Sequence, residues 1–206
     1  MNIEKLKQAE AGFLDRYPGG FENPEMVAIA KKHKMDQMVA YTQESFQKEN
    51  FRMPDLIVDR MVKVASRSSM VSVFEKPKFR DYAYALAPDR KRRLTDGLFS
   101  VCYGNEQQGF EAMVEVLVEG KLAKWTLMTV CQAYFRPNFE IFIKPTTAKG
   151  VIQTYELQNL QYKPKPSWAF YNQYRQAINQ MKSLLDPALS PSNAAFSGFL
   201  MMSMEG

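Results

Sequence analysis

Residues 89–120 read DRKRRLTDGLFSVCYGNEQQGFEAMVEVLVEG, and this stretch predicts two helices joined by a tight turn. Gly104 is a favourable stop for the first helix, Asn105 is a favourable N-cap for the second, and Gly120 ends the second. The apolar residues that fall on the two buried faces are Leu94, Leu98, Phe99, Val101, Cys102, Phe110, Met113, Val114, Val116 and Leu117. Because a short connection keeps successive helices in contact, we expect an antiparallel helical hairpin.

Helical patterns continue on both sides of this hairpin. Apolar residues recur at the spacing of an amphipathic helix in residues 3–16, 24–34, 35–46, 54–65 and 167–185. Pro24 and Pro54 suit the first turn of a helix. These patterns predict a predominantly helical chain of seven or eight helices.

A small β element is expected after residue 120, where β-branched and aromatic residues become dense. Residues 139–143, Phe-Glu-Ile-Phe-Ile, are the best strand candidate. Residues 70–74 are open to a short strand or a helical turn, and Pro77 predicts irregular backbone at residues 76–78.

The predicted fold class is therefore α+β, predominantly helical, in a single compact domain over residues 1–206 with a small β element. The change in texture leaves a subdivision open near residues 120–122. Residues 163–166, Lys-Pro-Lys-Pro, resemble a linker.

Composition predicts a folded, soluble chain, with 46% hydrophobic and 24% charged residues. Cys102 and Cys131 sit among apolar neighbours and are too few for a disulfide scaffold, which favours a reducing compartment. The amino terminus lacks the apolar core of a signal peptide, and the longest apolar run, residues 194–204, is far short of the ~20 residues that cross a bilayer. We expect a cytoplasmic protein without a membrane segment.

The charge of the chain is unevenly distributed. Residues 63–104 contain nine basic and four acidic residues, whereas the rest of the sequence contains 18 of each sign. A local basic excess predicts a positive face that attracts nucleic acid or another polyanion. The predicted phosphate contacts are Lys76, Lys78, Arg80, Arg90, Lys91, Arg92 and Arg93.

Aromatic residues interleave with these cations, as in surfaces that stack on single-stranded bases. Phe79, Tyr82 and Tyr84 follow Lys76 and Lys78 closely. The alternative is that Phe79 and Tyr82, which have helical spacing, belong to the core. In that case the basic residues form an ordinary solvated face.

A second anion site is predicted at residues 144–150, KPTTAKG. Lys144, Thr146, Thr147 and Lys149 combine two hydroxyls and two cations at an expected helix start, a position where backbone amides hold anions. Such a site would suit a small enzyme acting on a phosphorylated substrate. The alternative is that Thr146 or Thr147 caps its own helix.

No catalytic residue, metal site or cofactor is predicted, so an enzyme is the less favoured class. His33, the single histidine, lies in a basic run, and no phosphate-binding loop or nucleophile elbow occurs. The triplets at residues 75–78 and 119–121 resemble the Glu-x-Lys of metal-dependent nucleases, but Pro77 and an expected helix end do not suit adjacent strands.

The leading hypothesis is a non-catalytic cytoplasmic protein that binds nucleic acid or another polyanion. The alternative is an interaction module that docks its apolar carboxyl-terminal segment on a protein partner or a second copy. That segment contains Phe196, Phe199, Leu200, Met201 and Met202. The same residues would otherwise pack on the protein's own core.

Overall fold

The computed structural model describes residues 1–204, and these residues form eleven α-helices and three short 3-10 helices without a β-strand. The α+β prediction is therefore wrong: residues 1–204 are all-α, and they contain eleven α-helices where seven or eight were expected. The α-helices are α1 (Ile3–Arg16), α2 (Pro24–His33), α3 (Met35–Ser45), α4 (Pro54–Arg67), α5 (Glu75–Ala85), α6 (Pro88–Tyr103), α7 (Glu106–Glu119), α8 (Trp125–Phe135), α9 (Pro145–Thr154), α10 (Trp168–Ser183) and α11 (Asn193–Met204). The 3-10 helices are Gly20–Glu22, Lys48–Arg52 and Pro187–Leu189.

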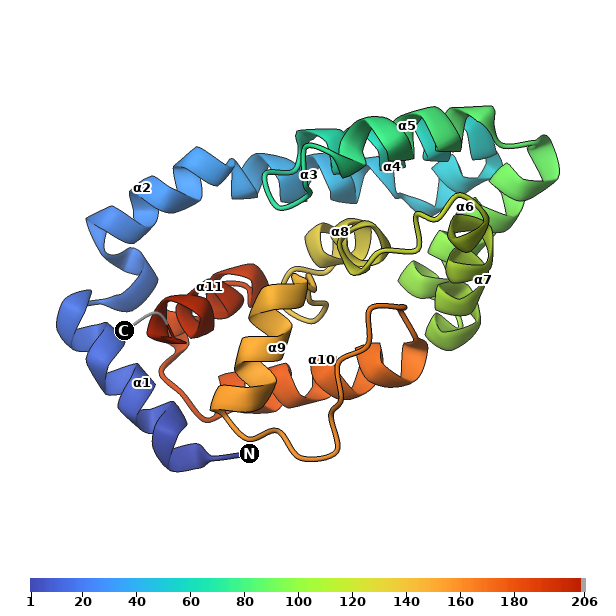
Figure 1. The fold of residues 1–206 in the computed structure, drawn as a ribbon. Helices are drawn as coiled ribbons and strands as arrows, with labels where there is room; N and C mark the ends of the chain where they lie inside the picture. The colour runs from blue at the N-terminus through green and yellow to red at the C-terminus, as the bar shows by residue number, and fades with distance from the viewer. Residues whose placement is uncertain (205–206) are drawn as a thin grey trace.

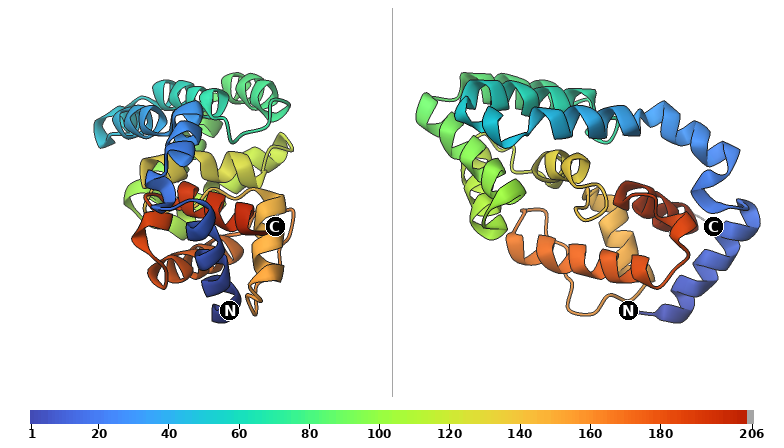
Figure 2. Two further views of the ribbon diagram at one scale, coloured as in Figure 1. Left: turned by 90° about the vertical axis from the view of Figure 1, so that its left-hand side faces the viewer. Right: turned by 180° about the vertical axis from the view of Figure 1, so that it is seen from behind.

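Helix α8 occupies the centre of the molecule. Its residues from Trp125 to Tyr134 are all buried, as expected for a helix that is apolar on every side. Figure 1 shows α3 and α4 on one side of α8, with α9 and α10 on the other, and the rear view in Figure 2 agrees. The α6–α7 hairpin closes one end of the molecule and α1 closes the other. Buried side chains from α1 to α11 form one continuous core.

The helical hairpin at α6 and α7 is confirmed. Asn105 caps α7 by accepting a hydrogen bond from the Gln108 amide at 3.0 Å. Gly97 and Gly109 lie where the two helices touch, and a Cβ atom added to Gly109 would lie 2.4 Å from the Gly97 carbonyl oxygen. Only glycine permits this approach of the two backbones.

The predicted strand at residues 139–143 is wrong: these residues belong to the non-helical connection between α8 and α9, which begins with a turn. Its amides bond to the preceding turn and to side chains, not to a neighbouring strand: the Phe139 and Glu140 amides donate to the Arg136 carbonyl oxygen at 3.0 and 2.9 Å. The Ile143 amide donates to Thr129 Oγ1 at 3.0 Å, and the Ile141 amide faces the Tyr171 hydroxyl at 3.4 Å. The alternating apolar pattern reflects anchoring of this connection in the core.

The irregular backbone predicted at residues 76–78 is also wrong, because these residues lie in the first turn of α5. Pro77 is the third residue of the helix, where the backbone N–H has no partner within the helix and its loss costs little. Residues 70–74 form bends and turns and contain neither a strand nor a helix, and α5 begins at Glu75.

No helix within residues 1–204 combines the length and the apolar character needed to cross a bilayer.

Candidate functional site: a lysine face

The basic start of α6 is paired with acidic residues from other helices. Arg90 donates to Glu115 at 2.9 Å and also binds Glu119, while Arg93 donates to Glu115 at 2.9 Å. Lys91 binds Asp55 of α4 at 2.7 Å. Hydrogen bonds from the two arginines lower the pKa of Glu115. Carboxylates outside the basic stretch therefore offset most of its charge.

The seven predicted phosphate contacts do not form one cluster. Lys76 and Lys78 lie in the first turn of α5, whereas Arg90–Arg93 follow its far end, about 15 Å away at the helical rise of about 1.5 Å per residue. Arg80 is paired with Asp81 at 2.8 Å. Only Lys76, Lys78 and Arg92 have no carboxylate within ion-pair distance among the described residues.

The start of α8 is tied to two segments that are distant from it in sequence. The Thr126 hydroxyl at the start of α8 donates to Glu75 at 2.7 Å, which ties α8 to α5. The indole N–H of Trp125 donates to the Lys163 carbonyl oxygen at 2.7 Å, which ties the α9–α10 connection to α8. Figure 1 shows α5, the α7–α8 connection and the α9–α10 connection on the side that faces the viewer.

Six lysines lie close in sequence to these contacts, and we call them the lysine face: Lys76, Lys78, Lys121, Lys124, Lys163 and Lys165. Lys76 is half-buried and the other five are exposed. Gly120, immediately before Lys121, lies against the Tyr82 ring, so the end of α7 also runs beside α5.

Within residues 1–204, no carboxylate lies within ion-pair distance of any lysine of this face. The acidic residues nearest to these lysines in sequence are engaged elsewhere: Glu75 by Thr126, and Glu119 by Arg90. These six lysines therefore lack the ion-pair partners that Arg90, Lys91 and Arg93 have at the start of α6.

Sequence reasoning missed four of the six lysines, although a signal was present. Residues 121–185 contain nine basic residues and only two acidic ones, Glu140 and Glu156. This excess was hidden because acidic residues in other parts of the chain bring the net charge outside residues 63–104 to zero. Glu156 is paired with Lys5, and Glu140 is buried among arginines, so neither carboxylate offsets the lysine face.

An exposed aromatic ring lies beside the lysine face. Phe74 is 77% exposed and Val73 is 69% exposed, and both directly precede α5. Phe79, by contrast, is buried in the core, which confirms the core interpretation for that ring. Phe74 is therefore the ring near Lys76 and Lys78 that is available for stacking.

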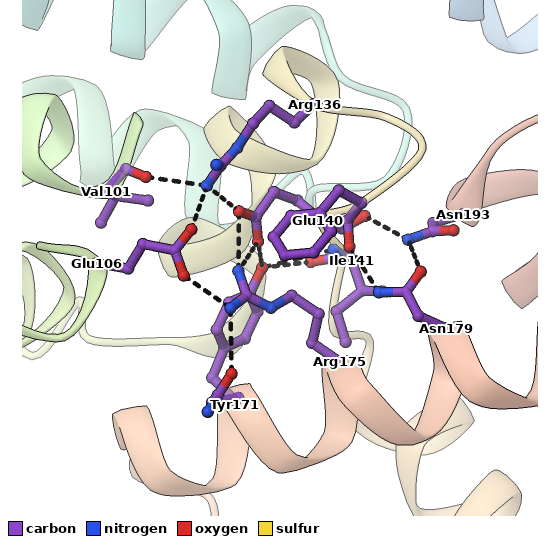
Figure 3. Close-up of polar contacts among 11 residues, drawn as sticks. Val101, Glu106, Arg136, Glu140, Ile141, Tyr171, Arg175, Asn179 and Asn193 are labelled. Atoms are coloured by element: carbon purple, nitrogen blue, oxygen red, sulfur yellow. Dashed lines mark hydrogen bonds and ion pairs between the residues drawn. The ribbon is translucent and has the colours of Figure 1, made fainter. Parts of the chain in front are cut away.

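A buried ion-pair network lies at the junction of α7, α8 and α10 (Figure 3). The Glu140 side chain has no exposed surface and accepts hydrogen bonds from Arg175 at 2.9 Å and from the Tyr171 hydroxyl at 2.6 Å. Arg136 also binds Glu140. Glu106 accepts from Arg136 and from Arg175, each at 2.7 Å. Two guanidinium groups thus balance two carboxylates.

The network is structural. Burial would raise the pKa of Glu106, but hydrogen bonds from Arg175 and Arg136 outweigh it and lower the pKa. Burial and the nearby Glu140 raise the pKa of Tyr171. Asn193 donates to the Glu140 carbonyl oxygen at 3.1 Å, and Asn179 donates to that of Phe139 at 2.9 Å. The α8–α9 connection is thereby fixed to α10 and α11.

A groove of about 1060 Å³ lies between the α2–α3 pair and α11, with the α8–α9 connection at its base. The four residues of the predicted anion site do not share one surface. Lys144 and Thr147 line the groove, whereas Thr146 and Lys149 do not. Helix α9 has no side-chain cap, so neither threonine caps it. Lys149 lies over the Tyr162 ring, 5.0 Å from its centre.

The predicted carboxyl-terminal docking residues are also divided. Phe196, Phe199 and Leu200 are fully buried, so they pack on the protein's own core. Met201 and Met202 are half-buried and line the groove.

The single histidine contacts a serine hydroxyl, and both cysteines are packed in the core. His33 is exposed, and its Nδ1 atom is 2.8 Å from Ser69 Oγ. Cys102 and Cys131 are buried free thiols, and burial raises the pKa of Cys102 to about 12. Within residues 1–204, no group of three or more potential ligands is placed to hold a metal ion.

Comparison of the chain with protein-family models, curated proteins and solved structures finds no match.

Proposed function

We propose that the protein binds a polyanion, with single-stranded nucleic acid as the favoured ligand, through the lysine face. The observation that supports this proposal is that six lysines without an ion-pair partner lie in three chain segments, which hydrogen bonds of Trp125 and Thr126 tie together. Keeping like charges together costs free energy unless a counter-charge arrives, and a phosphate backbone supplies one.

The chemistry of the face favours binding without sequence preference. Lysine ammonium groups act as point charges on phosphates and do not provide the bidentate geometry with which arginine reads guanine. Phe74 offers one exposed ring on which a base can stack. The paired residues Arg90, Lys91 and Arg93 have no contact role in this proposal.

Fluorescence anisotropy with labelled oligo(dT) tests the proposal. We expect binding at 50 mM salt that weakens about 50-fold at 200 mM if four phosphates are neutralised, because the single-strand salt slope is about −0.7 per contact. The variant Lys163→Glu/Lys165→Glu is expected to lose at least tenfold in affinity.

The control is Lys32→Glu/Lys48→Glu, which makes the same change of charge at exposed positions outside the lysine face. We expect less than a threefold loss for this control. The proposal fails if the protein binds neither single- nor double-stranded nucleic acid nor heparin at low salt. It also fails if the control weakens binding as much as the test variant.

A further inference from the structure

Helix α2 leaves much of its apolar side chain surface exposed. Met26 is its only buried residue, whereas Ile29 is 43% exposed and Ala30 is also exposed. Val27, Ile29 and Ala30 all line the groove. An amphipathic helix ordinarily buries such a face, so its apolar residues are available to an occupant of the groove.

The opposite wall of the groove is the small-residue face of α11. Ala194, Ala195, Ser197 and Gly198 line it, followed by Met201 and Met202. A Cβ atom added to Gly198 would have Phe21 as its nearest neighbour, at 3.9 Å, so the groove is open at this point. Small side chains on a helix allow a second helix to approach closely.

Methionine is concentrated in the groove. Met26, Met35, Met70, Met201 and Met202 line it, which is five of the 13 methionines in the chain. Flexible thioether side chains are used at surfaces that receive amphipathic helices of varied sequence. The volume of about 1060 Å³ is at the upper end of the range of about 300–1,000 Å³ for small-molecule pockets.

The charged groups of the groove are mainly basic. Lys31 lies on the α2 wall and Lys144 at the start of α9, and the described carboxylates approach neither within ion-pair distance. Asp36 is the one acidic residue among those that line the groove. An occupant with acidic flanks is therefore complementary to the groove.

We infer that the groove receives an amphipathic helix of a partner protein, with its apolar side on α2 and α11 and acidic residues toward Lys31 and Lys144. Helix α11 has 12 residues and is thus about 18 Å long, which suits about three turns of a partner helix. A second copy of this chain is disfavoured, because each copy carries a net charge of +5. This inference is independent of the lysine face.

The test uses a labelled 14-residue peptide with leucine on one helical face and glutamate on the other. We expect micromolar binding by anisotropy, and at least tenfold weaker binding of a peptide that has lysine in place of glutamate. Gly198→Leu should weaken binding at least tenfold by filling the groove. Gly12→Leu is the matched control, since Gly12 lies on α1 outside the groove and has free space around it.

Two further variants separate a specific loss from misfolding. Ile29→Glu places a negative charge on the exposed apolar wall and should weaken binding of the glutamate peptide. Lys31→Glu should do the same, whereas Lys32→Glu, on the neighbouring residue that does not line the groove, should have little effect. Circular dichroism and thermal melting verify that each variant is folded.

Other results would overturn the inference. They include no binding of the glutamate peptide up to about 1 mM, equal binding of the lysine peptide, and binding that Gly198→Leu leaves unchanged. A fatty acid that binds in a Gly198-dependent manner and is not displaced by the peptide would show a lipid site instead. A dimer that Gly198→Leu dissociates would show that a second copy occupies the groove.

Discussion

Glu140 is a carboxylate without exposed surface, and it is tolerated because Arg136, Arg175 and Tyr171 all donate to it. A buried ion pair is weak evidence of net stability, but removal of one member leaves the opposite charge buried and unpaired. The network also fixes the α8–α9 connection, which forms the base of the groove. Its value is thus in positioning a segment that has no regular structure.

The network predicts how stability depends on pH. The pKa of Glu106 is lowered in the folded protein, so the unfolded chain binds more protons below about pH 4.5. This contribution to stability is present at neutral pH and is lost as the pH falls through the folded pKa. Glu106→Gln should lower the free energy of unfolding by about 1–3 kcal/mol at pH 7, with a smaller further loss in acid than wild type.

Urea unfolding at pH 7 and pH 4 measures both effects. Glu111→Gln is the control on the same helix, because Glu111 is exposed and accepts only from Gln107. Parallel pH profiles for wild type and Glu106→Gln would contradict the account of the network.

The sequence did not predict that Glu140 is buried beside two arginines. Glu140 has the same apolar neighbours whether it alternates outward on a strand or is buried beside two arginines. The distinction depends on Arg175, which is 35 positions away in the chain. A pattern confined to a short window cannot contain that information.

Among the elements, the α6–α7 hairpin depends on two glycines in contact. The hairpin was predictable because its caps, its apolar spacing and its turn all lie within residues 89–120. The non-helical connection at residues 139–143 was not, because its hydrogen-bond partners Thr129 and Tyr171 lie on other elements. Local signals therefore predicted the hairpin, but they predicted a β element that is absent from residues 1–204 and too few helices.

The hairpin predicts opposite outcomes for two substitutions of glycine by alanine. Gly109→Ala places a Cβ atom 2.4 Å from the Gly97 carbonyl oxygen, so the helices must separate and stability should fall by about 1–3 kcal/mol or more. A Cβ atom added to Gly12, at an exposed position of α1, has no atom within 4 Å. Gly12→Ala should therefore raise stability by up to about 1 kcal/mol. Thermal and urea unfolding give both values, and equal effects would show that the close approach is absent.

At the scale of the whole molecule, the basic residues form two groups of different character. The start of α6 is dense in charge along the sequence, but α4 and α7 supply acidic partners. The lysine face is dispersed along the sequence, and its three segments are connected through Thr126 and Trp125. A count of charge along the chain detects the first group, whereas the second requires the tertiary structure or a search for acid-poor stretches.

The most direct test compares these two groups by oligo(dT) anisotropy, with three positive charges removed from each. We predict that Lys76→Gln/Lys124→Gln/Lys163→Gln weakens binding at least 30-fold at 50 mM salt and reduces the magnitude of the salt slope by about 2. Arg90→Gln/Lys91→Gln/Arg93→Gln, at positions already paired with carboxylates, should weaken binding less than threefold. An equal or greater loss in the second variant would contradict the assignment of the binding site to the lysine face.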